Sequence, residues 1–312
     1  MKLCYKFLFD SLYLILFLNN FYEAKRINVV KEITLNNSGL NLKYVSISNY
    51  SIRSEYASAP KYKINACYTG KSFSSMALGL FCYLFDDKNF LKHYKSANNK
   101  GANRHLCHRR NRNLLMTEVI KKYSNNNSTK FFNEWKNIYV VRNPISRFIS
   151  GFIQICVLKI GLPSNHPYCF NCKRSMNCFL TKLYTRLLKF KGTHNIVDRF
   201  LSYHFHPQKW QCEYFKYKDK YKIIHYDSDK KQFYETYLGE LRDSGVPEAK
   251  LTFIKKLFYT TKPIHKTDGK HITNMYKNYL LRNPKLLKLL LKIFYEDFEE
   301  FKFEIPNIEK LS

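Results

Sequence analysis

The stretch YVVRNPISRFISGF, residues 139–152, constrains the fold most, because it passes from a buried strand through a turn into a helix. Residues 137–142 form a short apolar run of the kind found in buried strands. Pro144 suits the first turn of the helix that we predict over residues 145–159. Arg142 ends the strand, where an unpaired guanidinium would be costly to bury. It therefore needs an anionic partner, which is either a ligand or an acidic side chain of the chain itself.

The same alternation of strands and helices runs through most of the chain. The pattern predicts further strands over residues 61–70 and 221–226, and helices over 73–87, 114–123, 179–190, 196–205 and 284–301. Strands that alternate with helices favour an α/β fold, with a mostly parallel central sheet flanked by helices.

The loop between the first of these strands and its helix, YTGKSFSSM, carries groups that suit a phosphate. Gly70 and Lys71 precede the predicted helix, and Ser74 and Ser75 lie at its start. Backbone N–H groups at a helix N-terminus favour an anion, and a lysine with hydroxyls would complete its cradle. The loop lacks the Gly-x4-Gly-Lys-Ser/Thr pattern of a Walker motif. The alternative is an ordinary helix start with a solvated lysine.

The second strand–loop–helix carries a similar set of groups. Arg142 leaves the strand, and Ser150 lies one to two turns into the helix. A guanidinium that grips two oxygens, with a hydroxyl beside it, makes a good phosphate clamp.

Together the two loops resemble the nucleotide-binding stretches of sulfotransferases, which use 3′-phosphoadenosine 5′-phosphosulfate. The first stretch of that family reads Pro-Lys-x-x-x-Thr, and Lys71, Ser74 and Ser75 match its lysine and hydroxyls. The second reads Arg-Asp-Pro-x-x-Arg-x-x-Ser, and four residues match it in register with Asn143 in place of Asp: Arg142, Pro144, Arg147 and Ser150.

The resemblance extends to the Golgi carbohydrate sulfotransferases of the chondroitin and dermatan type, sulfotransferase family 2, and to nematode members in particular. SYHFHPQKWQC, residues 202–212, is similar to the His-Trp-x-Pro…Cys stretch of that family, with Phe205 in place of Trp. The tail that ends in YEDFEEF is similar to its closing segment, so that matches run from about residue 58 to 304. The chain departs from the family at Gly70, where Pro is usual, and at the bulky Phe73.

This resemblance implies a P-loop-like sulfotransferase fold and a carbohydrate O-sulfotransferase that moves a sulfuryl group from 3′-phosphoadenosine 5′-phosphosulfate to a glycan hydroxyl, as on a chondroitin-like proteoglycan chain. Lys71 would stabilise the charge that grows on the leaving oxygen, and His204 would act as the base for the acceptor. His204 could equally be a structural histidine. The expected nucleotide-binding residues are Gly70, Lys71, Ser74, Ser75, Arg142 and Ser150. No metal is expected, since lysine, arginine and a helix end meet the charges.

The charge of the chain fits an anionic acceptor. Lys and Arg total 53 against 24 acidic residues, a net charge of +29 that favours an anionic partner. The loop over residues 96–113 carries Lys100, Arg104, Arg109, Arg110 and Arg112 without an acid, and could steer a polyanionic glycan or be merely solvated. AT-rich codons would explain part of the excess. We do not expect a nucleic-acid partner, because no nucleic-acid-binding signature is present. An inactive family member that binds anionic glycans is the alternative function.

The N-terminus and the cysteines favour the secretory route. We predict a signal peptide or signal anchor over residues 1–24, a stem over 25–60 and the sulfotransferase domain over 61–312, located in the Golgi lumen and either membrane-anchored or secreted. Sequons occur at Asn36, Asn49, Asn126 and Asn127. Setting Cys4 aside leaves an even eight of the nine cysteines, which suits disulfides. The alternative is a zinc site formed by Cys169, Cys172, Cys178 and Cys212.

Overall fold

The computed structural model describes residues 28–35, 40–47, 54–96, 106–163, 165–191, 195–226, 229–260 and 271–307. The leader expected over residues 1–24 and the sequons at Asn36 and Asn49 lie outside these ranges. Among the described residues, no helix combines the length and the apolar character that crossing a membrane requires.

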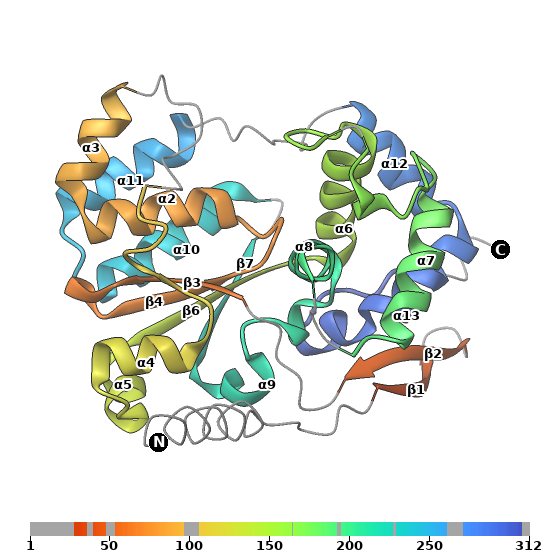
Figure 1. Cartoon of the computed structure of the whole chain (residues 1–312), viewed down its shortest axis with the longest axis horizontal. Coiled ribbons are helices and arrows are strands. Elements are labelled where there is room, and N and C mark those ends of the chain that lie inside the picture. The colour runs from red at the N-terminus through yellow and green to blue at the C-terminus, as the bar shows by residue number, and fades with distance from the viewer. Residues whose placement is uncertain are drawn as a thin grey trace, which may run out of the picture.

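A five-stranded sheet in the order β5-β3-β4-β6-β7 forms the centre of the molecule (Figure 1). Its strands are β3 (Glu55–Ala59), β4 (Ile64–Tyr68), β5 (Arg112–Asn113), β6 (Lys136–Arg142) and β7 (Tyr221–Tyr226). Strands β4, β6 and β7 are parallel, as expected of an α/β fold. Strands β3 and β5 add an antiparallel edge, because only a short 3-10 turn joins β3 to β4 and reverses the chain.

Both faces of the sheet are covered by helices, as the alternation of its buried side chains requires. Ile138 and Val140 of β6 join one core, and Tyr139 and Val141 join the other. The first core lies under α2 (Ser74–Phe85), α3 (Asp87–Ser96), α10 (Lys230–Asp243) and α11 (Glu248–Thr260). The second lies under α4 (Met116–Ser124), α5 (Ser128–Glu134) and α9 (Tyr214–Tyr217).

A third core fills a helical lobe beside the sheet, which we call the second lobe (Figure 1). Its helices are α6 (Pro144–Phe152), α7 (Met176–Leu188), α8 (Ile196–Phe205), α12 (His271–Leu281) and α13 (Pro284–Glu300). Pro144 occupies the first turn of α6 as predicted, and Asn143 caps that helix by accepting hydrogen bonds from the N–H groups of Ile145 and Ser146. A π-helical turn over Ile153–Val157 extends α6.

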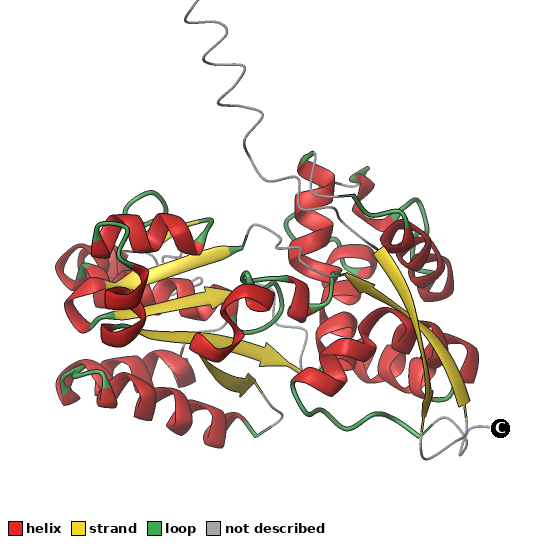
Figure 2. Ribbon diagram, turned by 90° about the horizontal axis from the view of Figure 1, so that it is seen from below, coloured by secondary structure: helices red, strands yellow, loops and turns green. Residues whose placement is uncertain are grey.

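The segment expected to be a stem differs from that expectation. Strands β1 (Asn28–Leu35) and β2 (Leu40–Ile47) form an antiparallel hairpin that lies against the helices of the second lobe (Figure 2). Leu42 and Val45 are buried in the third core, and the Ser46 hydroxyl donates a 2.7 Å hydrogen bond to Glu296. Strand β3 also lies before residue 61, so the central sheet begins within the segment that we predicted as a stem.

The eight described cysteines form four disulfides, which excludes the zinc alternative. The pairs are Cys67–Cys212, Cys82–Cys107, Cys156–Cys169 and Cys172–Cys178. The four cysteines proposed as zinc ligands are thus divided among three different bridges.

Candidate active site

The two loops identified in the sequence lie side by side in the structure. One follows β4 and leads into α2, and the other follows β6 and leads into α6, so both lie at the carboxyl ends of neighbouring parallel strands. This edge of a parallel sheet is where α/β proteins usually bind their ligands. It faces the second lobe, and α8 lies beside it (Figure 1).

Arg142 joins the two loops directly. Its Nη1 atom donates a 3.0 Å hydrogen bond to the carbonyl oxygen of Lys71, and its guanidinium lies 5.2 Å from the centre of the Tyr226 ring. The side chain is only half-buried, so it remains close to solvent. Its contacts include this carbonyl and the aromatic face of Tyr226.

Gln208, which sequence reasoning did not single out, connects the same two loops through its side-chain amide. Its Oε1 atom accepts hydrogen bonds of 2.9 Å from the Ser72 hydroxyl and 2.9 Å from the N–H of Arg142. Its Nε2 atom donates to the carbonyl of Arg142 at 2.8 Å. The backbone N–H of Gln208 donates at 2.8 Å to Asp297 of α13, and its carbonyl accepts at 2.8 Å from the Tyr139 hydroxyl. Gln208 therefore fixes the relative positions of the two loops.

Arg147, the second arginine of the motif, serves the fold. It is 1% exposed, and its guanidinium donates hydrogen bonds to the carbonyls of Gly70 (3.0 Å), His206 (2.8 Å) and Tyr203 (3.1 Å). Burial lowers its pKa, and the nearby carboxylate of Asp297 opposes that shift. Burial likewise raises the pKa of Asp297 to about 6, against backbone hydrogen bonds and Arg147, which lower it. One buried cation therefore ties the first loop to α8 and to the residues after it.

Gly70 lies in tight contact with α8. Its N–H donates a 2.9 Å hydrogen bond to the carbonyl of Tyr203, which a proline could not make. A Cβ atom at residue 70 would lie 2.7 Å from that carbonyl oxygen and 3.0 Å from Cδ2 of His204. The glycine is therefore matched to this chain's own α8, and its contacts place the His204 ring beside the first loop.

The orientation of His204 is set by its own helix. Its Nδ1 atom lies 2.8 Å from the carbonyl of Phe200, and the two rings are in tilted contact with their centres 4.2 Å apart. A carbonyl only accepts hydrogen bonds, so Nδ1 carries the proton in the neutral ring and Nε2 carries the lone pair. This tautomer is the one that a base acting through Nε2 needs.

The three predicted hydroxyl residues lie at different places. Ser74 begins α2 and is 9% exposed, and the hydroxyl of Tyr203 donates a 3.4 Å hydrogen bond to Glu55. Ser75 follows Ser74 and is partly exposed. Ser150 lies one turn beyond Arg147 in α6 and is 8% exposed.

The bulky Phe73 has its own place in the structure. Its backbone is left-handed, with φ 67°, as is that of Lys71, with φ 71°, and this kinks the loop just before α2. Its ring contacts a cluster of aromatic side chains on β7, α10 and α11: Tyr226, Phe233, Tyr234, Tyr237 and Phe258. Tyr226 also lies under Arg142, so this cluster supports both loops.

The basic loop is partly structural, contrary to a purely steering or solvated role. Arg110 pairs with Asp86 at 2.6 Å, and the largely buried Arg112 lies 3.7 Å from Glu55. Arg109 is exposed, whereas Lys100 and Arg104 lie outside the described residues. In the described ranges, no group of three or more His, Cys, Asp or Glu side chains is arranged to hold a metal ion.

The site as a whole brings cationic side chains, a helix start and an imidazole to one edge of the sheet. In comparison with known proteins, residues 54–304 match the sulfotransferase family. The chain therefore belongs to the sulfotransferase family.

Two relatives from Caenorhabditis elegans support this assignment. Carbohydrate sulfotransferase chst-1 is 31% identical over 246 residues, which covers 78% of this chain and 73% of that protein. An uncharacterised protein is 30% identical over 244 residues, covering 77% of this chain and 67% of that protein. No solved structure matches the chain.

Proposed function

We propose that this enzyme transfers a sulfuryl group from 3′-phosphoadenosine 5′-phosphosulfate to a hydroxyl of an anionic glycan, such as a chondroitin-like proteoglycan chain. The observation that carries the proposal is the contact between Arg142 and the backbone of Lys71. It brings together the two loops that a nucleotide with phosphates at both ends of its ribose would need. Family membership and the carbohydrate sulfotransferase among its relatives support the same reaction.

In this proposal Lys71 carries the electrostatic part of catalysis. Negative charge grows on the oxygen that bridges phosphate and sulfur as the bond to sulfur breaks, and a fixed cation there favours the transition state over the ground state. Arg142 and Arg147 both bond carbonyls of this loop, at Lys71 and Gly70. The loop is thus held in place before the reaction begins, so little energy is lost in arranging it.

Binding of the nucleotide falls to the remaining loop residues. Ser74, Ser75 and the N–H groups at the start of α2 would hold the 5′ end, together with Gly70. Arg142 and Ser150 would hold the 3′-phosphate, giving position rather than chemistry.

His204 would accept the proton of the attacking hydroxyl. Its ring lies against Gly70 at the first loop, and its Nε2 atom carries the lone pair. The proton moves to Nε2 as the acceptor oxygen forms its bond to sulfur, while the bridging oxygen leaves with the electrons of the broken bond.

Calorimetric titration with 3′,5′-adenosine bisphosphate, the product nucleotide, tests the nucleotide site. We expect binding by the wild type and by Arg199→Ala, which removes an exposed guanidinium from α8. Arg142→Ala should bind at least about tenfold more weakly, since one charge-assisted phosphate contact is lost. Undiminished binding by Arg142→Ala would contradict the clamp, and no binding by a folded wild type would favour the inactive, glycan-binding alternative.

Turnover on a panel of glycan acceptors tests the chemistry. Lys71→Ala should lose about a hundredfold or more in kcat while its affinity for the product nucleotide changes much less. Lys256→Ala, at an exposed position of α11, is the matched control and should turn over normally. A near-normal kcat for Lys71→Ala would exclude the role proposed for that lysine.

We also propose that the enzyme works in the Golgi lumen, held by its N-terminal segment or released from it. Pairing of all eight described cysteines suits an oxidising compartment. Asn126 and Asn127 are exposed at the start of α5, where a glycan could be attached. Expression of the full chain followed by endoglycosidase digestion should shift its mobility on a gel, and an unshifted, cytosolic protein would contradict this location.

A further inference from the structure

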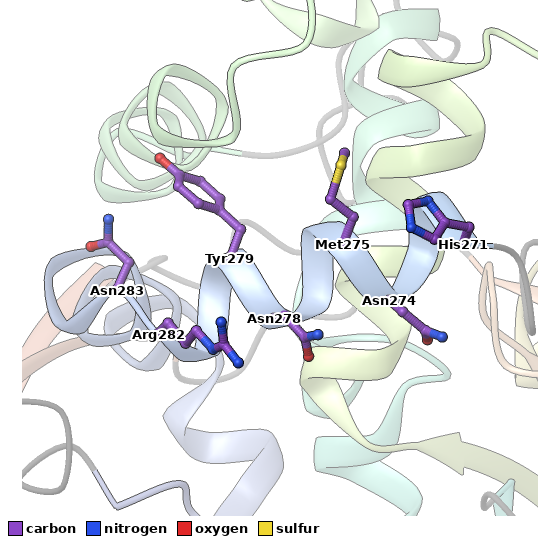
Figure 3. Close-up of a pocket in the computed structure, with 7 residues that line it drawn as sticks. All are labelled: His271, Asn274, Met275, Asn278, Tyr279, Arg282 and Asn283. Carbon is purple, nitrogen blue, oxygen red and sulfur yellow. The ribbon is translucent and has the colours of Figure 1, made fainter.

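One face of α12 forms a shallow hollow far from both loops in the sequence. Figure 3 shows His271, Met275 and Tyr279 one turn apart along one side of the helix, and Asn274, Asn278 and Arg282 along the neighbouring side. The hollow measures about 610 Å³. The side chains are well exposed for their size, with Met275 at 49% and Tyr279 at 50%.

The composition of this face is that of a surface for sugars rather than for an apolar partner. An exposed tyrosine ring offers a flat apolar surface with a polar tip, which suits the C–H face of a pyranose. Amide groups both donate to and accept from hydroxyls, as Asn274 and Asn278 could do. Arg282 adds a planar donor that fits a carboxylate or a sulfate with two parallel hydrogen bonds. The side chains of Asn274, Asn278, Tyr279 and Arg282 form no hydrogen bond or ion pair with any other described residue.

The lobe around this face carries no acidic side chain over long stretches. The sequence has no Asp or Glu in residues 135–197 or in residues 269–295, whereas these stretches contain ten and six Lys and Arg residues. They supply α6, α7, α12 and most of α13, together with the loop over residues 158–175. All 24 acidic residues of the chain lie outside these two stretches. The second lobe therefore carries much of the excess positive charge.

Exposed cations of this lobe lie close to the α12 face. The Tyr276 hydroxyl donates a 3.3 Å hydrogen bond to the carbonyl of Arg174, which brings the loop containing Lys173 and Arg174 beside α12. Both side chains are exposed, as are those of Lys277 and Lys285. A ligand on the face would thus meet several cations without desolvating any acid, which gives attraction at long range and a strong dependence on salt.

The α12 face is joined to the active site through α6. The rings of Phe152 and Tyr276 lie 5.5 Å apart, so α12 packs on the far end of the helix whose first residues carry the arginine motif. Helix α6, from Pro144 to Phe152, spans roughly 13 Å at about 1.5 Å per residue. A single sugar cannot reach over that length, but a polymer can occupy both places at once.

We infer that the α12 face, with the neighbouring cations of the second lobe, is a secondary binding site for a polyanionic glycan. It holds sugar units several positions away from the hydroxyl that reacts, with Tyr279 stacked on a ring and Arg282 on a carboxylate or sulfate. The inference rests on the proposed function for the identity of the ligand. It makes the enzyme selective for long chains, because a short oligosaccharide in the active site would not extend to α12.

The test compares long and short acceptors on matched variants. The double variant Tyr279→Ala/Arg282→Ala removes the ring and the guanidinium from the face. Its control is Tyr259→Ala/Lys256→Ala, which removes an equally exposed tyrosine, 58% accessible, and one positive charge from α11 on the other lobe. The probes are fluorescently labelled chondroitin polymer and a chondroitin tetrasaccharide, measured by anisotropy at two salt concentrations.

We expect the α12 variant to bind the polymer about tenfold more weakly than the wild type, as the loss of one charge-assisted hydrogen bond and one stacked ring implies. Its salt dependence should be shallower, and its affinity for the tetrasaccharide and for the product nucleotide should be unchanged. In turnover, KM for the polymer should rise while kcat stays the same. The control variant should match the wild type in every measurement.

Three results would overturn the inference: equal polymer binding by the α12 variant, an equal loss in the control, or an equal loss for the tetrasaccharide. The inference would also be overturned if single-stranded DNA bound to these same residues more tightly than the chondroitin polymer, since the surface would then serve another class of polyanion. Anisotropy needs no turnover, so the inference is separable from the proposed reaction. A wild type that binds the polymer through α12 but no nucleotide would refute the reaction and leave this site standing.

Discussion

Replacement of Arg147 by methionine isolates what the second arginine of the motif does. Methionine has a similar length and is apolar, so the change removes the charge and the donors without opening a large cavity. The carbonyl of Gly70 then loses its donor inside the protein, whereas those of Tyr203 and His206 each lose one donor and keep another, from the Gly70 N–H and the Gln211 amide. The carboxylate of Asp297 loses the cation that offsets its burial.

The expected cost is large. Each hydrogen bond from a charged donor contributes about 1.5–3 kcal/mol, and Arg147 makes three of them to backbone carbonyls. These contributions overlap, so we expect a loss of about 4 kcal/mol, a large part of the roughly 5–15 kcal/mol by which a domain is usually stable. Arg142→Met should cost less than about 1.5 kcal/mol, since that side chain is only half-buried.

Urea unfolding followed by circular dichroism measures both variants against the wild type. Arg147→Met should unfold at a much lower urea concentration with an unchanged slope, whereas Arg142→Met should keep its midpoint and lose the nucleotide. Should Arg147→Met fail to fold, Arg147→Lys provides a milder form, with one cation but without the planar fork. A midpoint for Arg147→Met or Arg147→Lys equal to that of the wild type would refute the structural role.

Three further variants test other contacts. Burial holds the pKa of His206 at about 3 in the folded protein, below its ordinary 6.5. Between those two pH values only the unfolded chain gains a proton at His206, so the free energy of unfolding falls by about 2 kcal/mol from pH 7 to pH 5. If the free energy of unfolding depended on pH equally in the wild type and in a His206→Gln variant, this would be contradicted. Gly70→Ala should weaken nucleotide binding, because its Cβ would lie 2.7 Å from the Tyr203 carbonyl; calorimetry with the product nucleotide decides. Cys212→Ser opens a bridge that closes a loop of 145 residues, so it should cost up to about 5 kcal/mol; an unchanged melting temperature would show that the bridge does not constrain the unfolded chain.

Local pattern was sufficient to predict the central elements. The apolar run and the Pro144 start placed β6 and α6 to within a few residues, because both signals act within the segment itself. The hairpin of β1 and β2 was missed although its signal was present. Strand β2 mostly alternates apolar and polar residues, and the sequence between the two strands, Asn-Asn-Ser-Gly, has a composition typical of turns, but the polar composition favoured a stem.

Contacts between distant segments could not be predicted in the same way. Spacing alone does not show which arginine of the motif is buried, since Arg142 and Arg147 both lie next to apolar residues. The role of Gln208 depends on Asp297, which is 89 residues further along the chain. Cysteine pairing is equally non-local, because an even number of cysteines predicts bridges but not their partners.

The hydrogen bonds of Gln208 and the Cys67–Cys212 bridge mean that the site can form only after most of the chain has been synthesised. Ser72 and Arg142 are held by Gln208, Gln208 is held by Asp297, and Cys67 is bridged to Cys212. Because a chain is synthesised from its N-terminus, the first loop is made long before the residues that fix its position. A chain cut short before α13 would therefore contain the sequence of the arginine motif without its geometry. Catalytic competence thus reports that translation and oxidative folding have both been completed.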